Sequence, residues 1–378
     1  LSESEKIEHV SRQFDKGRFL LILDNIDDML DDPVTREFIQ HAERFENAKV
    51  LATCRIHTRL LDSQRELRLG SLETRYALAL IRDIGRDIAR IRESSEFDLL
   101  RMNEKLGGHP YSIVIAVPMF AYEPFEAVLS NLPERLGTED EQAGRILQWS
   151  YSKLSFEEQR FLENISVFSG EVPLAALLYI NDGKGEELVR SLVKKNMIEY
   201  SSSSELYGLH PLLREFAYAK LGDRKDELQV KAAQEIAPRL TGAFWSEALK
   251  LYELGVDSTR RARNEKILSE VLFGLGNMHF RMGNYTSAEN CYEESFTLNQ
   301  KVGDEFGMAN IIGQRALIEW DRGNYDEAIK LYNQAKAIFE KLGGQSGIAT
   351  TLHQLGMIEH DRGNYDEAIK LYNQAKAI

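Results

Sequence analysis

Apolar residues form short unbroken runs near the start of the chain and take a helical spacing further along it. The runs "FLLIL" and "KVLAT" predict strands at 19–24 and 49–53. A run without alternation is typical of a parallel strand that is buried on both faces. A polar helix up to about Lys16 and a second helix at 34–46 are expected beside these runs. The pattern therefore predicts alternating helices and buried strands in this part of the chain.

The middle of the chain has a helical spacing of apolar residues without such runs. Residues 72–130 are expected to be helical, with Ser71 as the N-cap of the first helix, because a serine side chain accepts a hydrogen bond from the first turn. Further on, the pattern predicts three helices, a two-stranded ribbon in "MIEYSSSSELYGL" and a last helix; the helices are expected at 143–152, 155–167, 185–195 and 211–221. Three helices and a hairpin are the pattern of a winged helix.

The last third of the chain contains an internal repeat. The segment "DRGNYDEAIKLYNQAKAI" occurs at 321–338 and again, residue for residue, at 361–378, which is a spacing of 40 residues. A weaker copy, "RMGNYTSAENCYEESFTL", stands another 40 residues earlier, at 281–298. Each unit has apolar residues at the spacing of two amphipathic helices, so the repeat predicts an α-solenoid.

The repeat unit resembles the tetratricopeptide repeat in its longer, 40-residue variant. Every copy has a turn glycine, then a small residue, then a tyrosine in the same register; these are Gly283, Gly323 and Gly363, then Ala288, Ala328 and Ala368, then Tyr292, Tyr332 and Tyr372. Leu275-Gly276 and Leu355-Gly356 match the signature of the first helix, whereas Arg315-Ala316 departs from it.

The array is expected to begin before its first clear copy. Trp245, Ala248 and Tyr252 fall on the same register one period earlier, so a degenerate first repeat is expected from about residue 228. The clear repeats begin at about residue 266, and the last one is cut within its second helix at residue 378.

Composition excludes some classes of function. A formal net charge of -13 argues against broad nucleic-acid binding, which needs clustered lysine and arginine. Cys54 and Cys291 stand far apart and in no metal-like spacing, as in proteins of a reducing cytosol, so a cytoplasmic protein is expected. No apolar run reaches the length of a transmembrane helix, so no membrane contact is expected.

Asp24 stands where the first predicted strand ends, and open α/β sheets place their ligands at that end. A carboxylate there commonly holds the Mg²⁺ of a bound nucleotide, usually through water. The partner of such an acid, a glycine-rich loop that ends in Gly-Lys-Ser/Thr, is absent from the sequence. Two interpretations of Asp24 therefore stay open, a Mg²⁺ ligand or an acid that merely ends a strand.

Four separated motifs, in their order and spacing, resemble the NB-ARC-type members of the STAND class of signalling ATPases. The segment "FLLILDNIDD" resembles the Walker B strand, "KVLATCR" the sensor strand, "GGHPYSIVIA" the Gly-x-Pro motif of the helical domain, and "YGLHPLLREFA" a winged-helix segment. The resemblance covers essentially the whole chain. It implies a mostly α-helical fold with a partial α/β nucleotide-binding domain at 1–65, a helical domain at 66–138, a winged helix at 139–225 and a repeat solenoid at 226–378.

The resemblance assigns three residues to the chemistry of the nucleotide. Asp24 would hold Mg²⁺ through water, and Arg55 would sense the terminal phosphate. Asn25 stands where many relatives carry a second acid, and a neutral amide orients water but accepts no proton at ordinary pH. Hydrolysis is therefore expected to be slow. A surface ion pair is the alternative role of Arg55.

Two further residues are assigned to contacts with the nucleotide. Pro110 would press against the adenine, and as a proline it also suits the start of a helix. His210 would donate to the β-phosphate of ADP, although a structural role at the start of a helix stays open. Pro211 follows it where many relatives carry an aspartate, so any contact of that aspartate is lost. The remaining histidines, His109 among them, lack the spacing of a metal site.

The resemblance implies a switch. ADP would hold the domains closed, exchange for ATP would open the protein and permit homo-oligomerisation, and the repeats would bind a protein or peptide. Phe280, Trp320 and His360 share one repeat position, and such an aromatic-lined surface suits a protein ligand. Because the sequence lacks the phosphate loop, this chain alone is expected to bind nucleotide poorly and to have little ATPase activity.

Two other classes of function are the alternatives. One is a repeat scaffold for protein interactions with a vestigial nucleotide domain. The other is a DNA-binding regulator that uses the winged helix. Against the second, the segment "GEELVRSLVKKNMI" offers only Arg190, Lys194 and Lys195 for phosphate contacts, and Glu186 and Glu187 dilute their charge.

Overall fold

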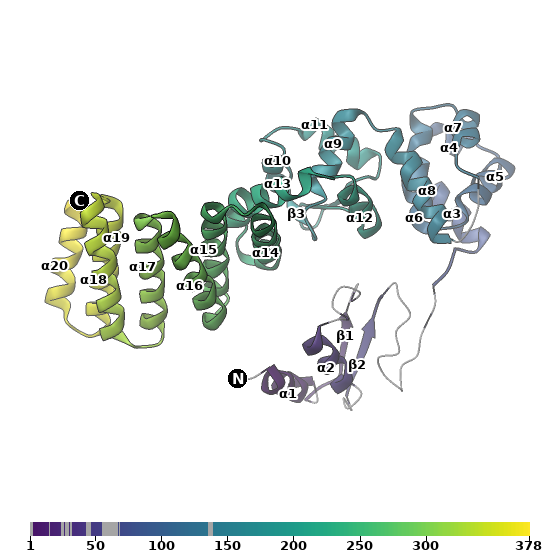
Figure 1. Cartoon of the computed structure of the whole chain (residues 1–378). Helices are drawn as coiled ribbons and strands as arrows, with labels where there is room; N and C mark the ends of the chain where they lie inside the picture. Colours follow the sequence, from purple (N-terminus) through teal and green to yellow (C-terminus); the bar gives the residue numbers. More distant parts are fainter. Residues whose placement is uncertain are drawn as a thin grey trace. The chain divides into compact units, whose positions relative to one another are not determined.

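A computed structural model of the chain describes residues 3–14, 16–23, 26, 30, 32–42, 47–54, 67, 69–134 and 139–378. The chain divides into two units, Leu1–Gly70 and Ser71–Ile378. The described residues are mostly helical, with one two-stranded and one three-stranded sheet (Figure 1). This confirms the predicted fold class, a mostly α-helical chain with a helical repeat array at its C-terminal end.

The first unit alternates helices and strands as predicted. Its elements are α1 (Glu3–Phe14), β1 (Phe19–Leu23), α2 (Pro33–Ala42) and β2 (Ala48–Ala52). The two strands pair in parallel over their whole length, from Phe19 opposite Ala48 to Leu23 opposite Ala52. Parallel neighbours require a crossover connection, and α2 lies in this connection.

The strands of this unit are more exposed than the sequence predicts. Leu20, Ile22 and Leu51 are 62%, 58% and 53% exposed. Within the described residues the sheet has only two strands, and no second layer covers these side chains. The prediction that the strands are buried on both faces is therefore wrong for this part of the structure. An apolar run shows that burial of its side chains is favourable, but it does not show that other helices or strands cover them.

The second unit begins with a helical bundle, as predicted for residues 72–130. Its helices are α3 (Thr74–Ile84), α4 (Ala89–Arg92), α5 (Glu96–Leu106), α6 (Pro110–Ala116), the 3₁₀ helix η2 (Val117–Ala121) and α7 (Phe125–Asn131). Ile81, Leu99, Ile113 and Phe120 are fully buried in its core.

The predicted N-cap of this bundle is wrong. Glu73 precedes α3, and no side chain caps this helix. The reason is a tertiary hydrogen bond, since Leu72 N donates to Gly108 O at 2.9 Å. This bond holds Leu72 against the loop that contains Gly108. The chain before α3 therefore does not take the course that would let the Ser71 side chain accept a hydrogen bond from the first turn of the helix.

A three-stranded sheet and five helices follow the bundle. The elements are α8 (Glu139–Ser152), α9 (Phe156–Ile165), β3 (Val172–Pro173), α10 (Leu174–Ile180), α11 (Glu186–Lys194), β4 (Glu199–Ser201), β5 (Leu206–Gly208) and α12 (Pro211–Ala219). The strands are antiparallel in the order β3-β5-β4. The predicted ribbon is present as β4 and β5, whereas β3 and α10 were not predicted.

A stack of paired helices completes the unit (Figure 1). The helices before the clear repeats are α13 (Arg224–Lys231), the π-helical turn η3 (Ala232–Ile236), the 3₁₀ turns η4 (Ala237–Arg239) and η5 (Gly242–Phe244), and α14 (Trp245–Ala262). The clear repeats are the pairs α15 (Glu265–Arg281) and α16 (Tyr285–Val302), α17 (Glu305–Asp321) and α18 (Tyr325–Leu342), and α19 (Gln345–Asp361) and α20 (Tyr365–Ala377). The boundaries recur every 40 residues, as the sequence repeat predicts.

A glycine and a tyrosine fix the packing within a repeat. A Cβ atom on Gly276 would lie 2.5 Å from Tyr292 Cε1, and one on Gly356 would lie 2.7 Å from Tyr372 Cε1. The residue of the first helix must therefore be small where the tyrosine of the second helix crosses it. In the middle repeat a buried alanine, Ala316, takes this position, so the departure from the signature costs only one methyl group of space.

Candidate functional site

The nucleotide-chemistry residues of the first unit, Asp24, Asn25 and Arg55, lie outside the described residues. The structure describes the backbone on which they depend. Thr53 N donates to Leu23 O at 2.9 Å, and Ile26 N donates to Thr53 O at 3.0 Å. The carboxyl ends of β1 and β2 therefore meet at one edge of the sheet, as expected for parallel strands.

The Gly-Gly-His-Pro loop of the second unit has a backbone that requires its glycines. Gly107 ends α5 with φ of 70°, and Gly108 has φ of 68°. A Cβ on Gly108 would lie 2.9 Å from Leu72 O, so only glycine lets the two segments pair. His109 then caps α6 by accepting from Ser112 N at 3.3 Å, and Pro110 is the first residue of this helix. The helix-starting role predicted for Pro110 is confirmed.

The structure brings this loop to His210. The rings of Tyr111 and His210 are stacked with centroids 3.7 Å apart and planes inclined by 15°. His210 caps α12, since its Nδ1 accepts from Leu212 N at 3.3 Å. Two segments that the sequence assigns separately, the Pro110 loop and His210, therefore form one junction.

The capping bond fixes the protonation of His210. Because Nδ1 accepts a hydrogen bond, the ring proton of the neutral form lies on Nε2. Burial, and to a lesser extent His109, lower the pKa of His210 below its ordinary value of 6.5, so the ring is neutral at pH 7. Within the described residues Nε2 has no hydrogen-bond partner, and it is not fully buried. It is therefore a donor that an incoming acceptor can reach.

The tyrosine of the junction is more deeply enclosed. Tyr111 is 7% exposed, and its hydroxyl has no hydrogen-bond partner among the described residues. Burial raises the pKa of Tyr111, with a smaller contribution from Glu199. Burial and the nearby Glu171 raise the pKa of Glu199 in turn. The junction is thus a poorly solvated region in which hydrogen bonds and charges act strongly.

The lowered pKa of His210 predicts a pH dependence of stability. In the unfolded chain His210 has its ordinary pKa of 6.5. As the pH falls from about 7.5 to about 5.5, the His210 ring is therefore protonated in the unfolded chain before it is protonated in the folded chain. The stabilisation is therefore complete above pH 6.5 and is lost as the pH falls through the folded-state pKa. Urea unfolding at the two pH values is expected to show a larger loss in the wild type than in His210→Asn, which retains a capping side chain.

The raised pKa of Glu199 also makes stability depend on pH, with the opposite sign to His210. Glu199 is present in both the wild type and His210→Asn, so its contribution cancels when their losses of stability are compared. Equal losses in the wild type and in His210→Asn would contradict the neutral, buried state of His210.

Sequence reasoning found Pro110 and His210 and missed His109 and Tyr111. A signal for His109 was present, because His-Pro begins both "HPYS" and "HPLL", and both histidines cap the helix that follows. Nothing local marked Tyr111, since its partner stands on a helix far along the chain.

The helix α11 is poorly suited to bind DNA phosphates. Arg190 Nη2 lies 2.8 Å from Glu186 Oε2, and Lys195 Nζ lies 2.6 Å from Glu158 Oε1. Two of the three cations that the segment offers for phosphate contacts, Arg190 and Lys195, are therefore already paired with acids. This disfavours a regulator that binds DNA through α11.

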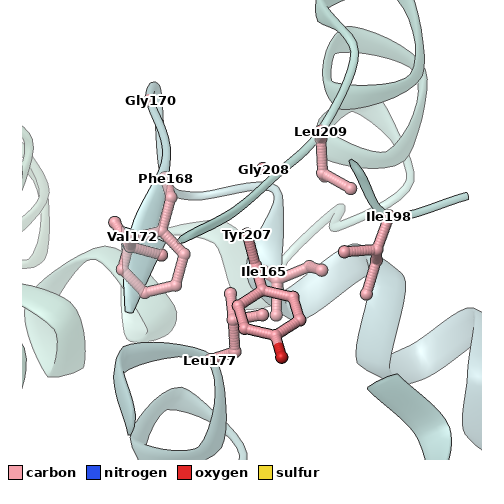
Figure 2. A pocket seen from close by; sticks show the side chains of 9 residues that line it. All are labelled: Ile165, Phe168, Gly170, Val172, Leu177, Ile198, Tyr207, Gly208 and Leu209. Carbon is pink, nitrogen blue, oxygen red and sulfur yellow. The ribbon is translucent and has the colours of Figure 1, made fainter. Parts of the chain in front are cut away.

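The cavity found among the described residues beneath the three-stranded sheet is too small for a ligand. Figure 2 shows the side chains of Phe168, Val172, Leu177 and Tyr207 around a cavity of about 10 Å³, which is at most the space of one water molecule. In the described ranges, no three His, Cys, Asp or Glu residues gather to hold a metal ion. None of the helices described there is long and apolar enough to cross a membrane.

Comparison with known proteins identifies the helical array. Residues 307–378 and residues 269–301 match two tetratricopeptide repeat family models. No curated protein sequence matches the chain.

Two solved structures are similar to the chain at low identity. One is a Signal Transduction ATPase with Numerous Domains (STAND) protein with a tetratricopeptide repeat sensor, from Pyrococcus horikoshii; it is 16% identical over 99% of this chain and 63% of that chain, with a TM-score of 0.49. The other is BtubC from P. vanneervenii, 16% identical over 63% of this chain and 79% of that chain, with a TM-score of 0.34. The chain thus spans less than two thirds of the STAND protein's length. The family matches show that the C-terminal part of the chain consists of tetratricopeptide repeats.

Proposed function

We propose that the protein is a nucleotide-dependent signalling switch, in which ADP at the junction of Pro110, Tyr111 and His210 holds a closed state and the tetratricopeptide repeats sense a protein ligand. The observation that carries this proposal is the stack of Tyr111 on His210. This stack joins the loop of Pro110 to His210. The sequence resemblance assigns the contact with the adenine to Pro110 and the contact with the phosphate to His210. His210 Nε2–H is the group that would donate to a phosphate oxygen, and Pro110 would lie against the base.

The junction gives a nucleotide a way to favour one state. A ligand shifts an equilibrium only by the difference in its affinity for the two states. A nucleotide that touches both the loop of Pro110 and His210 stabilises the arrangement in which they are stacked, because it loses one set of contacts when they separate. Exchange for ATP would then open the protein and permit oligomerisation.

A buried contact connects this part of the unit to the repeats. Ser169 donates to the carboxylate of Glu247 on α14, from its backbone N at 2.8 Å and from its Oγ at 2.6 Å. Glu247 is only 7% exposed, so breaking the contact would leave a buried carboxylate without its donors. In the proposed switch, this contact transmits a signal from the repeats toward the part that carries His210.

Asp24, Asn25 and Arg55 remain predictions for the hydrolysis of ATP. Asp24 would hold Mg²⁺ through water, and Arg55 would contact the terminal phosphate. With an amide at Asn25, the expected reaction is slow, as in a regulatory ATPase. These roles rest on the sequence resemblance alone.

The test is ADP binding by the full-length protein, measured by calorimetry in the presence of Mg²⁺. His210→Ala removes one donor to a charged acceptor and is expected to weaken ADP binding about tenfold or more. His353→Ala is the control, because His353 lies on the repeat helix α19 and pairs with Tyr372. Its affinity for ADP should equal that of the wild type.

Two results would count against the switch. One is an unchanged affinity of His210→Ala for ADP. The other is a full-length protein that binds neither ADP nor ATP at millimolar concentration, which would favour a repeat scaffold for protein interactions.

A further inference from the structure

The turns between the paired repeat helices carry aromatic side chains in register. Phe280 near the end of α15 lies 5.8 Å from Tyr285 at the start of α16, centroid to centroid. One period later, Trp320 and Tyr325 pack in the same apolar cluster. In the last repeat, His360 lies 5.3 Å from Tyr365. The same ring pair therefore recurs at the same end of each repeat.

Carboxylates from the following repeat lie against these rings. Tyr285 Oη donates to Asp321 Oδ2 at 3.2 Å, and Trp320 Nε1 donates to Asp361 Oδ2 at 3.0 Å. Both aspartates stand at the same repeat position, directly after Trp320 or His360. We call the residues Tyr285, Trp320, Asp321, His360, Asp361 and Tyr365 the aromatic–acidic face.

The aromatic–acidic face is open to solvent. The side chains of His360 and Asp361 are 60% and 42% exposed, and Tyr365 is 59% exposed. Asp321 is also exposed, and within the described residues only its Oδ2 accepts a hydrogen bond. Asp321 therefore keeps acceptor capacity after its bond to Tyr285, whereas Asp361 Oδ1 already lies 3.5 Å from His360 Nδ1.

Among the described residues, the arginines that are nearest to this face in sequence do not pair with its aspartates. Arg322 and Arg362 follow the two aspartates in sequence, but both pair with other carboxylates. The nearby charge of Asp321 raises the pKa of Tyr285, followed by smaller contributions from burial and from their hydrogen bond. The charge of Asp321 therefore acts on the ring beside it.

We propose that the aromatic–acidic face binds an extended basic segment of a partner protein, with arginine or lysine side chains over the rings and against Asp321 and Asp361. This inference rests on the proposed function, in which the repeats sense a protein ligand, and it specifies the chemistry of that ligand. A guanidinium is attracted by the face of an aromatic ring and makes strong hydrogen bonds to a carboxylate. An acidic ligand would meet like charge in a chain whose net charge is already -13.

The repeat predicts the spacing of the basic residues. Trp320 on α17 bonds directly to Asp361 on α19, so equivalent positions of successive repeats lie one helix spacing, about 10 Å, apart at this end. An extended chain advances roughly 3.4 Å per residue. A partner whose cations recur at about every third residue would therefore place one cation on each repeat.

The probe is the peptide Arg-Gly-Ser-Arg-Gly-Ser-Arg, with its glutamate counterpart Glu-Gly-Ser-Glu-Gly-Ser-Glu as the charge control. Calorimetry with the wild-type chain is expected to detect binding of the arginine peptide alone, and binding should weaken as salt screens the exposed charges. The fluorescence of Trp320 gives a local readout, because the chain has only three tryptophans. Trp149→Phe and Trp245→Phe isolate it, and both remove a buried indole N–H that lacks a partner among the described residues.

The decisive variant is Asp321→Asn with Asp361→Asn. It is expected to bind the arginine peptide about tenfold more weakly than the wild type, because two charge-assisted contacts are lost. The matched control, Asp223→Asn with Asp366→Asn, makes the same change of charge at two exposed positions away from this face, the N-cap of α13 and the first turn of α20. It should retain wild-type affinity.

Three results would overturn the inference: equal binding of the glutamate peptide, an unchanged affinity of Asp321→Asn with Asp361→Asn, or an equal loss in the matched control. The ADP titration separates this inference from the nucleotide switch. Loss of ADP binding in His210→Ala with no peptide binding by the wild type would refute the basic ligand alone. Peptide binding by a full-length protein that binds no nucleotide would refute the nucleotide switch alone.

Discussion

Replacement of Tyr292 by alanine is expected to lower the free energy of unfolding of the repeat array by about 3 to 5 kcal/mol, the usual cost of truncating a buried aromatic residue. The Tyr292 ring is completely buried and occupies the space that Gly276 leaves open. Its hydroxyl also donates to Asn277 Oδ1 at 2.8 Å, so the truncation removes a hydrogen bond as well as a contact surface. Urea unfolding followed by far-ultraviolet circular dichroism measures the loss.

The matched control is Tyr365→Ala, the same substitution at a tyrosine that is 59% exposed. It is expected to change the free energy of unfolding by less than about 0.5 kcal/mol, as for surface positions in general. Equal losses in the two variants would contradict the packing of Tyr292 against Gly276.

The repeat array is the part of the fold that the sequence predicts best. The reason is physical: each helix pair can bury its apolar face only against the next pair, so the same residues must recur in each copy. The buried Ala288, Ala328 and Ala368 are such residues. Together with the helical spacing of the apolar residues and the turn glycine of each copy, they predict both helices of a repeat and the turn between them.

The elements that escaped prediction depend on distant contacts. Strand β3 has two residues, and it exists as a strand because Val172 pairs with Tyr207 and Pro173 with Leu206. No local periodicity reveals a pairing of that kind. Ser71 has the right residue type for an N-cap, yet the bond of Leu72 to Gly108 decides the local geometry.

The candidate site was predictable one segment at a time. Pro110 and His210 belong to short motifs whose residue types have a chemical meaning, and the sequence therefore assigns both. The stack of Tyr111 on His210 joins two such segments. The local pattern of a single sequence does not reveal contacts between segments that are far apart in the chain. The pairing of the two motifs consequently emerged only in three dimensions.

Replacement of Glu158 by alanine is expected to lower the free energy of unfolding of the part that contains α9 and α11 by about 3 to 5 kcal/mol, because it leaves a largely buried cation without its partner. Glu158 is 5% exposed, and the side chain of Lys195 is 14% exposed. The carboxylate lies 2.6 Å from Lys195 Nζ, accepts from Ser191 Oγ at 2.6 Å, and accepts from Ser155 N at 2.8 Å. Urea unfolding near pH 7 measures the difference.

Acid should reduce this difference. Burial by itself raises the pKa of Glu158, but hydrogen bonds from Lys195, Ser191 and the Ser155 backbone outweigh it and leave the pKa below its ordinary value of 4.5. The stabilisation is therefore complete above that value and is lost as the pH falls through the folded-state pKa. The control Glu186→Ala breaks an exposed pair with Arg190 and should cost less than about 1 kcal/mol. If both variants lost the same stability, Lys195 would not depend on Glu158, and the argument that this cation is unavailable to DNA phosphates would fail with it.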